Sequence, residues 1–366
     1  MPATAPKLQA ASMLLDFFKK HDRSAQVAPS NERFVVPAGE KLLTAALDAG
    51  LAWPHDCRVG SCGKCRCILK DGKIKPLADF AYTLDHEDIA AGAILACQSQ
   101  LKSDVVVEVS LEEQTSEISH AMGTISEIDE LTHDIVSVKI ELDQPRFHGV
   151  RAGQYFEVAT HDISLPRSYS LARRPDPDGV AELNFVIRHV PGGEFTEWLF
   201  KESQTGQQLS LSGPFGDFYL REARERMFCV AGGSGLAPII AIIEEGLAQK
   251  RTDDCIVLFG ARTQADLYYT ELLNKLGEQW LGKFQLRPIL SHENESSDWP
   301  GERGLVTSVI PSFASGADFG NDQAYLCGPP AMIDAAIAEF ERLGMPNSNI
   351  HFDKFLDASS MPAGRV

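Results

Sequence analysis

Four cysteines carry the clearest chemical pattern in this sequence. Three of them, in the run CRVGSCGKC, have the spacing C-x4-C-x2-C, and the fourth follows in ILACQ. They are Cys57, Cys62, Cys65 and Cys97. This spacing is typical of a [2Fe–2S] cluster, in which each iron takes two thiolates. Three sulfurs from one short run require a curled loop, which Gly60 and Gly63 permit. The pattern therefore predicts a centre that passes one electron at a time.

The alternatives to a cluster are a zinc site and a set of unrelated thiols. Structural zinc sites favour paired C-x2-C motifs, which the C-x4-C spacing does not fit. Cys67 lies two residues after Cys65, and we expect it to be a small buried residue on the outgoing strand. Four residues flank the ligands and form either an exposed docking lip or a solvated loop: Pro54, His55, Arg58 and Lys64.

Composition and length describe a multi-domain chain. Its 366 residues exceed what one core usually organises, so we expect three domains. No stretch approaches the roughly 18 apolar residues of a membrane span, and no secretory signal is recognisable. Eight cysteines fit a reducing compartment, so we expect a cytoplasmic protein without a membrane partner. A monomer is the simplest expectation for an electron shuttle. The net charge of −17 argues against nucleic acid and allows a partner with a locally basic docking face.

The N-terminal third contains two predicted parts. Residues 1–23 have the pattern of an amphipathic helical extension, packed on a domain surface or serving as a membrane or partner anchor. Residues 24–113 predict a β-hairpin from AQVAP and ERFVV, a helix in GEKLLTAALDAG closed by Gly50, the cysteine loop and a final strand, DVVVEV. This order resembles that of ferredoxins, and the resemblance implies a β-grasp fold. The polar run EEQTSEISHA then marks a linker.

Residues 122–220 are dense in short β-rich runs, such as DIVSVKIEL, QYFEVA and AELNFVIRHV, which predict a small antiparallel barrel. In RSYSLA, Arg167 and Tyr169 alternate with Ser168 and Ser170, so a cation, a ring and a hydroxyl emerge close together. This group suits a flavin, which offers a phosphate, an aromatic ring and a hydrogen-bonding N5. The PGGEFT turn that follows is either a phosphate-binding turn or a simple connection.

Residues 221–356 alternate strands and helices, and residues 357–366 form a tail. The run MFCVAGGSGLAPIIAIIEEGLAQK indicates a buried strand, a Gly-rich turn and a helix, the unit that receives a dinucleotide phosphate. CIVLFGART, a helix from about Asp266, QLRPILS and QAYLCGPPAMIDAAIAEFERLG continue the alternation, which predicts a doubly wound parallel sheet. Cys229 and Cys255 lie inside strand-like runs and are expected in the core. The fold class is thus multi-domain, α+β and α/β.

The order of GQY, RSYSLA, GGSGLAP and CGPPAM is similar to that of the ferredoxin-NADP reductase superfamily. With its N-terminal ferredoxin region, the chain resembles the reductase components of bacterial multicomponent oxygenases, such as benzoate dioxygenase reductase and methane monooxygenase reductase. The resemblance implies an enzyme that passes electrons from NADH to FAD, to the [2Fe–2S] cluster and to a terminal Rieske or di-iron oxygenase in a transient complex. The phthalate dioxygenase reductase type uses FMN and has the reverse domain order, so we expect FAD here.

The resemblance also implies roles for individual residues at the flavin. Arg167 would contact the flavin diphosphate, Tyr169 would pack on the ribityl chain and ring, and Ser170 would lie near N5. Phe355 is expected to cover the flavin, with Phe352 as the alternative. The residues expected to approach the diphosphate are Gly192, Gly193, Phe195 and Thr196.

At the nucleotide, the resemblance implies that the pyrophosphate lies over Gly232, Gly233, Ser234 and Gly235. The turn that borders the nicotinamide would be formed by Cys327, Gly328 and Pro329. Cys327 would thus lie near the carbon that transfers hydride, unless it is merely a packed cysteine at a strand end. Asp266 matches an acid of NADH-using members and favours NADH, whereas Arg262 leaves NADPH open.

Two other functions stay open at this stage. One is a reductase of the same build for deoxysugar biosynthesis, which would supply a pyridoxamine-type dehydratase. The other is a non-catalytic electron carrier or redox sensor whose nucleotide domain only regulates. The second alternative predicts no reduction of the flavin by NADH, and the first differs only in the protein that accepts the electrons.

Overall fold

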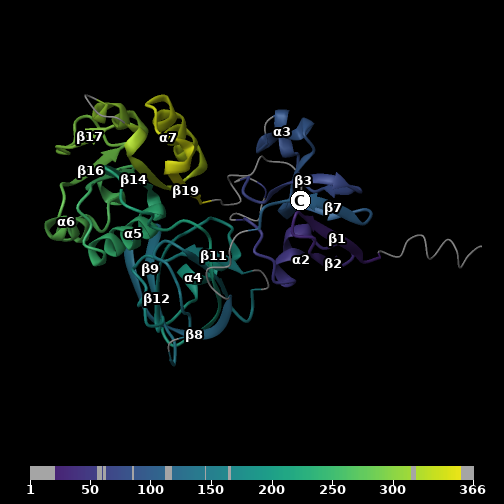
Figure 1. Cartoon of the computed structure of the whole chain (residues 1–366). Coiled ribbons are helices and arrows are strands. Elements are labelled where there is room, and N and C mark those ends of the chain that lie inside the picture. The colour runs from purple at the N-terminus through teal and green to yellow at the C-terminus, as the bar shows by residue number, and fades with distance from the viewer. Residues whose placement is uncertain are drawn as a thin grey trace, which may run out of the picture. The chain divides into compact units, whose positions relative to one another are not determined.

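The computed structural model describes residues 21–55, 60, 63–84, 86–111, 118–144, 146–163, 166–314 and 319–355. The chain divides into two compact units, Met1–Gln114 and Thr115–Val366 (Figure 1). Among the described residues, none of the helices has the length and hydropathy needed to cross a bilayer.

The first unit is built on a five-stranded sheet of order β2-β1-β7-β3-β5. Its strands are β1 (Arg23–Ala28), β2 (Arg33–Val36), β3 (Arg66–Asp71), β5 (Ala93–Leu95) and β7 (Val105–Glu108), with a β4 (Ile74–Pro76) and β6 (Ser99–Leu101) ribbon beside them. The predicted hairpin is the antiparallel pair β1 and β2, and β1 also pairs in parallel with β7. The predicted helix is α2 (Leu42–Asp48), which buries Leu42 and Leu43, and Gly50 follows it with φ of +80°. The short helix α3 is His86–Ala90.

Two sequence predictions differ from the structure at the edges of this unit. The N-terminal helix was expected over residues 1–23; residues 1–20 lie outside the described residues, and Arg23 already begins β1. The linker was expected to extend into SHA, but Ser119 begins the long strand β8 (Ser119–Thr132). Pairing with β13 explains this difference, because Ser119 faces Gly213 in the ladder and the sheet extends strands that look polar in isolation.

The second unit begins with an antiparallel sheet of order β11-β10-β13-β8-β9-β12. Its other strands are β9 (Ile135–Glu141), β10 (Tyr155–Ala159), β11 (Arg167–Ser170), β12 (Glu182–Arg188) and β13 (Gln208–Phe215). An antiparallel bridge between Leu171 and Phe185 joins the end of β11 to β12, so the two edge strands meet. The sheet therefore curls into the predicted barrel around buried rings such as Phe156 and Phe185.

The rest of this unit is a parallel sheet of order β17-β16-β15-β14-β18-β19. Its strands are β14 (Arg226–Gly232), β15 (Asp254–Ala261), β16 (Phe284–Leu290), β17 (Glu302–Arg303), β18 (Gln323–Gly328) and β19 (Ile350–Lys354). Its helices are α5 (Leu236–Ala248), α6 (Thr270–Gln279), α7 (Pro330–Arg342) and the 3-10 helix η5 (Val306–Phe313). The chain runs outward from β14 to β17 on one side and returns through β18 and β19 on the other. A ligand crevice is expected where this order reverses, at the carboxyl ends of β14 and β18.

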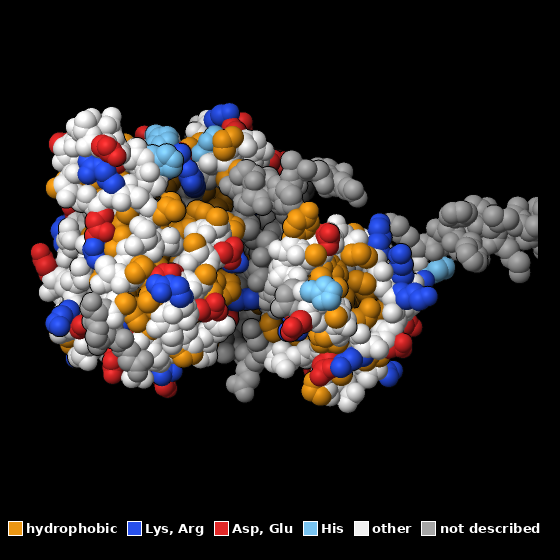
Figure 2. Space-filling view, turned by 90° about the horizontal axis from the view of Figure 1, so that it is seen from above, with side chains coloured by type: hydrophobic (Ala, Val, Ile, Leu, Met, Phe, Trp, Pro, Cys, Tyr) orange, Lys and Arg blue, Asp and Glu red, His pale blue; other side chains and the backbone are white. Residues whose placement is uncertain are grey.

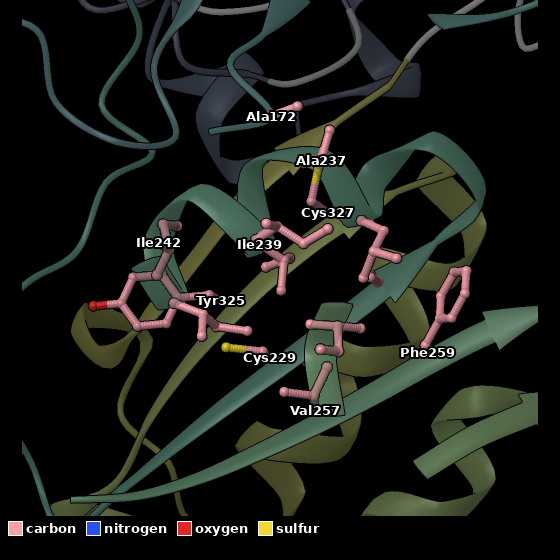
Figure 3. Packing of buried hydrophobic residues seen from close by; sticks show 14 of the residues in the cluster. Ala172, Cys229, Ala237, Ile239, Ile242, Val257, Phe259, Tyr325 and Cys327 are labelled. Atoms are coloured by element: carbon pink, nitrogen blue, oxygen red, sulfur yellow. The ribbon is translucent and has the colours of Figure 1, made fainter. Parts of the chain in front are cut away.

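Alternating residues of the central strands face two separate cores. Cys229 packs with α5 and α6, whereas Phe228 and Val230 pack with α7 and η5. Figure 3 shows Cys229 and Val257 beneath Ile239 and Ile242 of α5. Helices thus cover both faces of the sheet, as the doubly wound prediction requires. Cys229 and Cys255 are fully buried strand residues, which confirms their assignment to the core.

One helix begins later than the sequence indicates. It was expected from about Asp266, but α6 starts at Thr270, and Asp266 belongs to the 3-10 turn η4 (Gln264–Asp266). The Asp266 carboxylate accepts hydrogen bonds from the backbone N–H and hydroxyl of Thr263, at 2.8 and 2.9 Å. This capping box closes a separate turn and moves the helix start past Tyr269, which has a left-handed φ of +55°.

Gly235 offers a test of how tightly the crevice is packed. A Cβ at Gly235 would lie 2.3 Å from the carbonyl oxygen of Cys327. Because the atoms that this Cβ would meet are backbone atoms of Cys327 and Gly328, we expect Gly235→Ala to lower the free energy of unfolding by about 2–4 kcal/mol, measured with urea. Gly206→Ala is the control, since its Cβ would meet nothing within 4 Å and only its φ of +92° opposes it. Its cost should be about 1 kcal/mol. Equal losses would contradict the packing argument.

Candidate functional site

Two of the four predicted cluster ligands are described, and they lie together. Cys65 precedes β3, Cys97 lies in the 3-10 turn η2 (Ala96–Gln98), and their Sγ atoms are 3.2 Å apart. Both side chains are buried. The backbone brings them together, because the Ala96 N–H donates to the Cys65 carbonyl at 3.2 Å and the Trp53 indole donates to the same oxygen at 3.4 Å. Cys57 and Cys62 lie outside the described residues.

The two described glycines of the cysteine run have the left-handed backbone that a curled loop would need. Gly60 and Gly63 have φ of +91° and +78°, values that disfavour residues with a Cβ. The Thr83 hydroxyl donates to the Gly60 carbonyl at 2.6 Å and ties the loop to the adjacent 3-10 turn. Cys67 is buried within β3, paired with Ile94 in the register of the sheet, as expected for a core residue. Two buried thiols beside a glycine-shaped loop fit an iron–sulfur cluster.

The residues flanking the ligands are only partly described. Pro54, His55 and Lys64 are intermediate in exposure, and Arg58 lies outside the described residues. His55 Nδ1 lies 2.6 Å from the Trp53 carbonyl oxygen, so this side chain is held against the loop backbone. This contact gives part of the expected docking lip a fixed shape.

Strand β11 presents the predicted flavin residues on alternating faces. The Tyr169 ring packs against Phe195 and Phe185, with ring centroids 5.5 and 6.3 Å apart. Burial raises the pKa of Tyr169, which the nearby Arg167 opposes only in part, so the phenol stays neutral. Arg167 is partly exposed at the start of the strand. A fixed aromatic ring and a cation on one strand face fit a flavin nucleotide.

The two residues predicted to be catalytic meet through a third residue, Asp353. The Ser170 hydroxyl, only 5% exposed, donates to Asp353 Oδ2 at 3.0 Å. Asp353 lies in β19 and is paired with Cys327 of β18 in the sheet register. Burial, and then the neighbouring Asp353 carboxylate, raise the pKa of the Cys327 thiol well above its usual value. The thiol therefore stays protonated, which fits a packing or orienting role and not a nucleophile.

The two glycine turns of the parallel sheet pack directly on each other. Besides the contact at Gly235, a Cβ at Gly232 would lie 2.6 Å from Met332 Sδ. Gly328 has φ of +143°, and its Cβ would lie 2.9 Å from the Gly232 carbonyl oxygen. The turn η3 (Gly233–Gly235) leads into the N-terminus of α5, where backbone N–H groups favour phosphate. This cradle of glycines fits a dinucleotide.

Comparison with protein families divides the chain into the same three kinds of module. Residues 25–102 match the 2Fe-2S iron-sulfur cluster binding domain. Residues 122–219 match the oxidoreductase FAD-binding domain, and residues 229–337 match the oxidoreductase NAD-binding domain.

Relatives align over nearly the whole chain. The xylene/toluene monooxygenase electron transfer component XylA of Pseudomonas putida is 38% identical, over 93% of this chain and 98% of the relative. The reductase component DmpP of phenol 2-monooxygenase from Pseudomonas sp. (strain CF600) is 31% identical, over 91% and 94%. The crystal structure of the Amycolatopsis cytochrome P450 reductase GcoB superposes with a TM-score of 0.76 at 30% identity, over 91% and 98%. The chain belongs to the oxygenase reductase components of the ferredoxin-NADP reductase superfamily.

As a member of this family, the reductase is an oxidoreductase with FAD, NAD and [2Fe–2S] as its cofactors. This confirms the family, the fold class and the cofactors expected from the sequence. When bound, FAD accepts a hydride and can release its two electrons one at a time.

The PGG turn of the reductase is closed by its own side chains. The Thr196 hydroxyl donates to the Val190 carbonyl at 3.0 Å and accepts from the Val190 N–H at 3.1 Å. The Gly192 N–H donates to Glu197 at 3.1 Å. Gly193 is the N-cap of α4 (Glu194–Lys201), and the Phe195 ring packs against Tyr169. Thr196 thus shapes the turn, and Phe195 connects it to the flavin strand.

The aromatic residues at the end of β19 lie on opposite sides of the parallel sheet. Phe355 packs against the core that contains Cys327 and Ala172, and its N–H donates to the Gly328 carbonyl at 2.9 Å. Figure 3 shows Cys327 beside Ala237 and Ala172 in that core. Phe352 packs with the core under α7. Of the two, Phe355 lies on the side where the barrel meets the sheet.

Two residues of this site were missed by sequence reasoning: Asp353 and Arg188. Asp353 lies in HFDKFL, where attention fell on the aromatic residues. Arg188 follows the apolar run of β12, and a Cβ at Gly233 would lie 3.7 Å from its Nη1. A lone Arg at the end of a barrel strand, close to a predicted phosphate turn, was the available signal.

Proposed function

We propose that this reductase oxidises NADH and delivers single electrons through its [2Fe–2S] cluster to the terminal oxygenase of an aromatic-hydrocarbon pathway. The convergence of Ser170, Asp353 and Cys327 carries the proposal. These residues come from the flavin strand and from the strand ends that border the nicotinamide turn. Hydride transfer needs the nicotinamide and flavin rings held in contact. The buried hydrogen bond between Ser170 and Asp353 would hold together the strands that carry the two rings.

The cluster would be held by Cys57, Cys62, Cys65 and Cys97. The short distance between the Cys65 and Cys97 sulfurs supports their binding to the same iron. Their burial would exclude water from that side of the cluster.

The flavin would be held by β11 and the turn before α4. Tyr169 would pack on the ribityl chain and ring, Arg167 would contact the diphosphate, and Ser170 would lie near N5. Phe355 would cover the ring from the other side, supported by its packing in the core beside Cys327. The diphosphate would also be approached through Gly192, Gly193, Phe195 and Thr196.

The pyrophosphate of the dinucleotide would lie over the turn Gly232, Gly233, Ser234 and Gly235. Cys327, Gly328 and Pro329 would border the nicotinamide. Asp266 would accept from the ribose, which supports NADH as the donor. The functional parts would correspond to residues 24–113, 122–220 and 221–356, with the barrel extended to include the start of β8.

The partner would be an oxygenase bound transiently, and the reductase would be a cytoplasmic monomer. The names of its relatives, which include xylene/toluene monooxygenase and phenol 2-monooxygenase components, support an aromatic substrate for that oxygenase. On the larger unit, acidic and basic side chains are interspersed across the face seen in Figure 2. Charges of both signs on that face would give a partner only weak electrostatic steering there.

Anaerobic addition of NADH to the holo protein tests the proposal. The flavin absorbance at about 450 nm should bleach rapidly, followed by reduction of the cluster. Absence of bleaching would favour a carrier or sensor instead of a reductase. Electron transfer should then be measured to a purified aromatic oxygenase and to a pyridoxamine-type dehydratase. Reduction of the dehydratase alone would replace the oxygenase assignment.

A further inference from the structure

Asp134 of the flavin barrel reaches the nucleotide side of the parallel sheet. It lies in the turn between β8 and β9, yet its carboxylate accepts from Arg262, beyond the end of β15, at 3.2 Å. It also accepts from Arg188 Nε of β12 at 2.9 Å. Burial opposes ionisation of Asp134, but Arg188, Thr132 and His133 outweigh it and lower its pKa. Asp134 is therefore a carboxylate at neutral pH.

Arg262 is held by two carboxylates at once. The same Nη2 atom that donates to Asp134 also donates to Asp266 Oδ1 at 3.3 Å. Asp266 itself is fixed by the capping box of Thr263, so its position does not depend on Arg262. About half of the Arg262 side chain is exposed. An anion could therefore reach this guanidinium if the carboxylates did not already occupy it.

We propose that Asp134 is a specificity-determining residue, which excludes NADPH by keeping Arg262 paired with carboxylates. A 2′-phosphate needs an available cation, and it would meet two negative charges around an arginine that is already engaged. A ribose diol needs no such cation. Selection of the dinucleotide would thus depend on a residue of the flavin barrel. This inference rests on the placement of the adenosine ribose at Asp266 in the proposed function.

His133 lies beside the two carboxylates that hold Arg262. Its ring nitrogens lie 3.8 Å from Asp134 Oδ2 and 3.7 Å from Asp266 Oδ1. These three side chains also have the spacing of a metal site. Because Arg188 and Arg262 already pair with the carboxylates, we assign the group to ion pairing and not to a metal.

The test compares Asp134→Asn with the unaltered holo reductase in two measurements. The first is flavin reduction by NADH and by NADPH, and the second is calorimetric binding of 2′,5′-ADP and 5′-AMP. The unaltered reductase should use NADH strongly in preference. Asp134→Asn should raise kcat/KM for NADPH and the affinity for 2′,5′-ADP by about tenfold, the scale of one charge-assisted contact. Values for NADH and 5′-AMP should stay within about twofold.

Two further variants separate this explanation from others. Glu245→Gln removes an ion pair with Arg174 that also joins the barrel to α5, and it should not change nucleotide preference. Adding Arg262→Gln to Asp134→Asn should abolish the gain. A gain that survives without Arg262, or that Glu245→Gln reproduces, would overturn the proposal. No gain in Asp134→Asn would overturn it too, whereas failure of NADH to reduce the unaltered flavin would instead refute the proposed function.

Discussion

Replacing Cys97 by serine is expected to abolish electron delivery through the cluster. NADH oxidation should continue when a dye accepts the electrons directly from the flavin. Cys97 is buried with its sulfur 3.2 Å from that of Cys65, so a hydroxyl there replaces one of the four predicted ligands. Substitution of a residue that only supports a metal ligand already lowers metal affinity or activity by about 10–100-fold. Loss of a ligand should therefore lower the rate of electron delivery by at least about 100-fold. The measurements are visible absorption of the cluster and steady-state reduction of the partner oxygenase.

Cys67→Ala provides the matched control for this result. It removes another buried thiol of the same unit, in β3 and two residues from Cys65, without touching the predicted ligand set. It should keep the cluster spectrum and electron delivery. If Cys67→Ala loses the cluster and Cys97→Ser retains it, the assignment of ligands is wrong. If Cys97→Ser also stops NADH oxidation by the dye, the flavin and cluster parts do not act separately.

The second large effect is expected from Ser170→Ala, which should slow flavin reduction by NADH about 100-fold, the usual scale for one positioned polar group. The hydroxyl is buried and donates its hydrogen to Asp353 at 3.0 Å, so its oxygen is held in a fixed position. Stopped-flow reduction at saturating NADH measures the step directly. The affinity for NADH should change little, because the proposed function assigns the hydroxyl to the reacting end of the site and not to the adenosine end.

Ser168→Ala is the control on the same strand, since Ser168 lies on the same face of β11 but is exposed. It should leave the reduction rate unchanged. Asp353→Asn keeps an oxygen that can accept from Ser170 and should retain most of the rate, whereas Asp353→Ala should approach the rate of Ser170→Ala. Normal reduction in Ser170→Ala would remove this serine from the catalytic step and leave the other cofactor assignments intact.

Features that depend on neighbouring residues were predictable from the sequence. A few adjacent residues determine the local backbone conformation in three places: the glycines of the cysteine run, the alternation of RSYS and the turn GGSG. The left-handed backbone at Gly60 and Gly63, the strand β11 and the turn before α5 accordingly appear where they were expected. The three-part fold follows from the order of such local signals along the chain.

Features that depend on distant pairing were not predictable. Asp353 acquires its partner only when β19 joins β18 and approaches the barrel, and Asp134 meets Arg262 only across the two sheets. The start of β8 was missed because Ser119 is stabilised by its ladder with β13 and not by its own hydropathy. The early start expected for α6 failed because the Asp266 carboxylate caps a separate turn.

The hydrogen bond between Ser170 and Asp353 also has a consequence for synthesis of the chain. On the ribosome, all six barrel strands emerge long before residue 353, because β13 ends at Phe215. Domains generally fold as units during synthesis, and contacts between distant residues form late. All the strands of a nascent barrel could thus be paired while Ser170 still lacks the Asp353 carboxylate that accepts its hydrogen bond. Full competence of the flavin centre would coincide with arrival of the last strand of the neighbouring sheet.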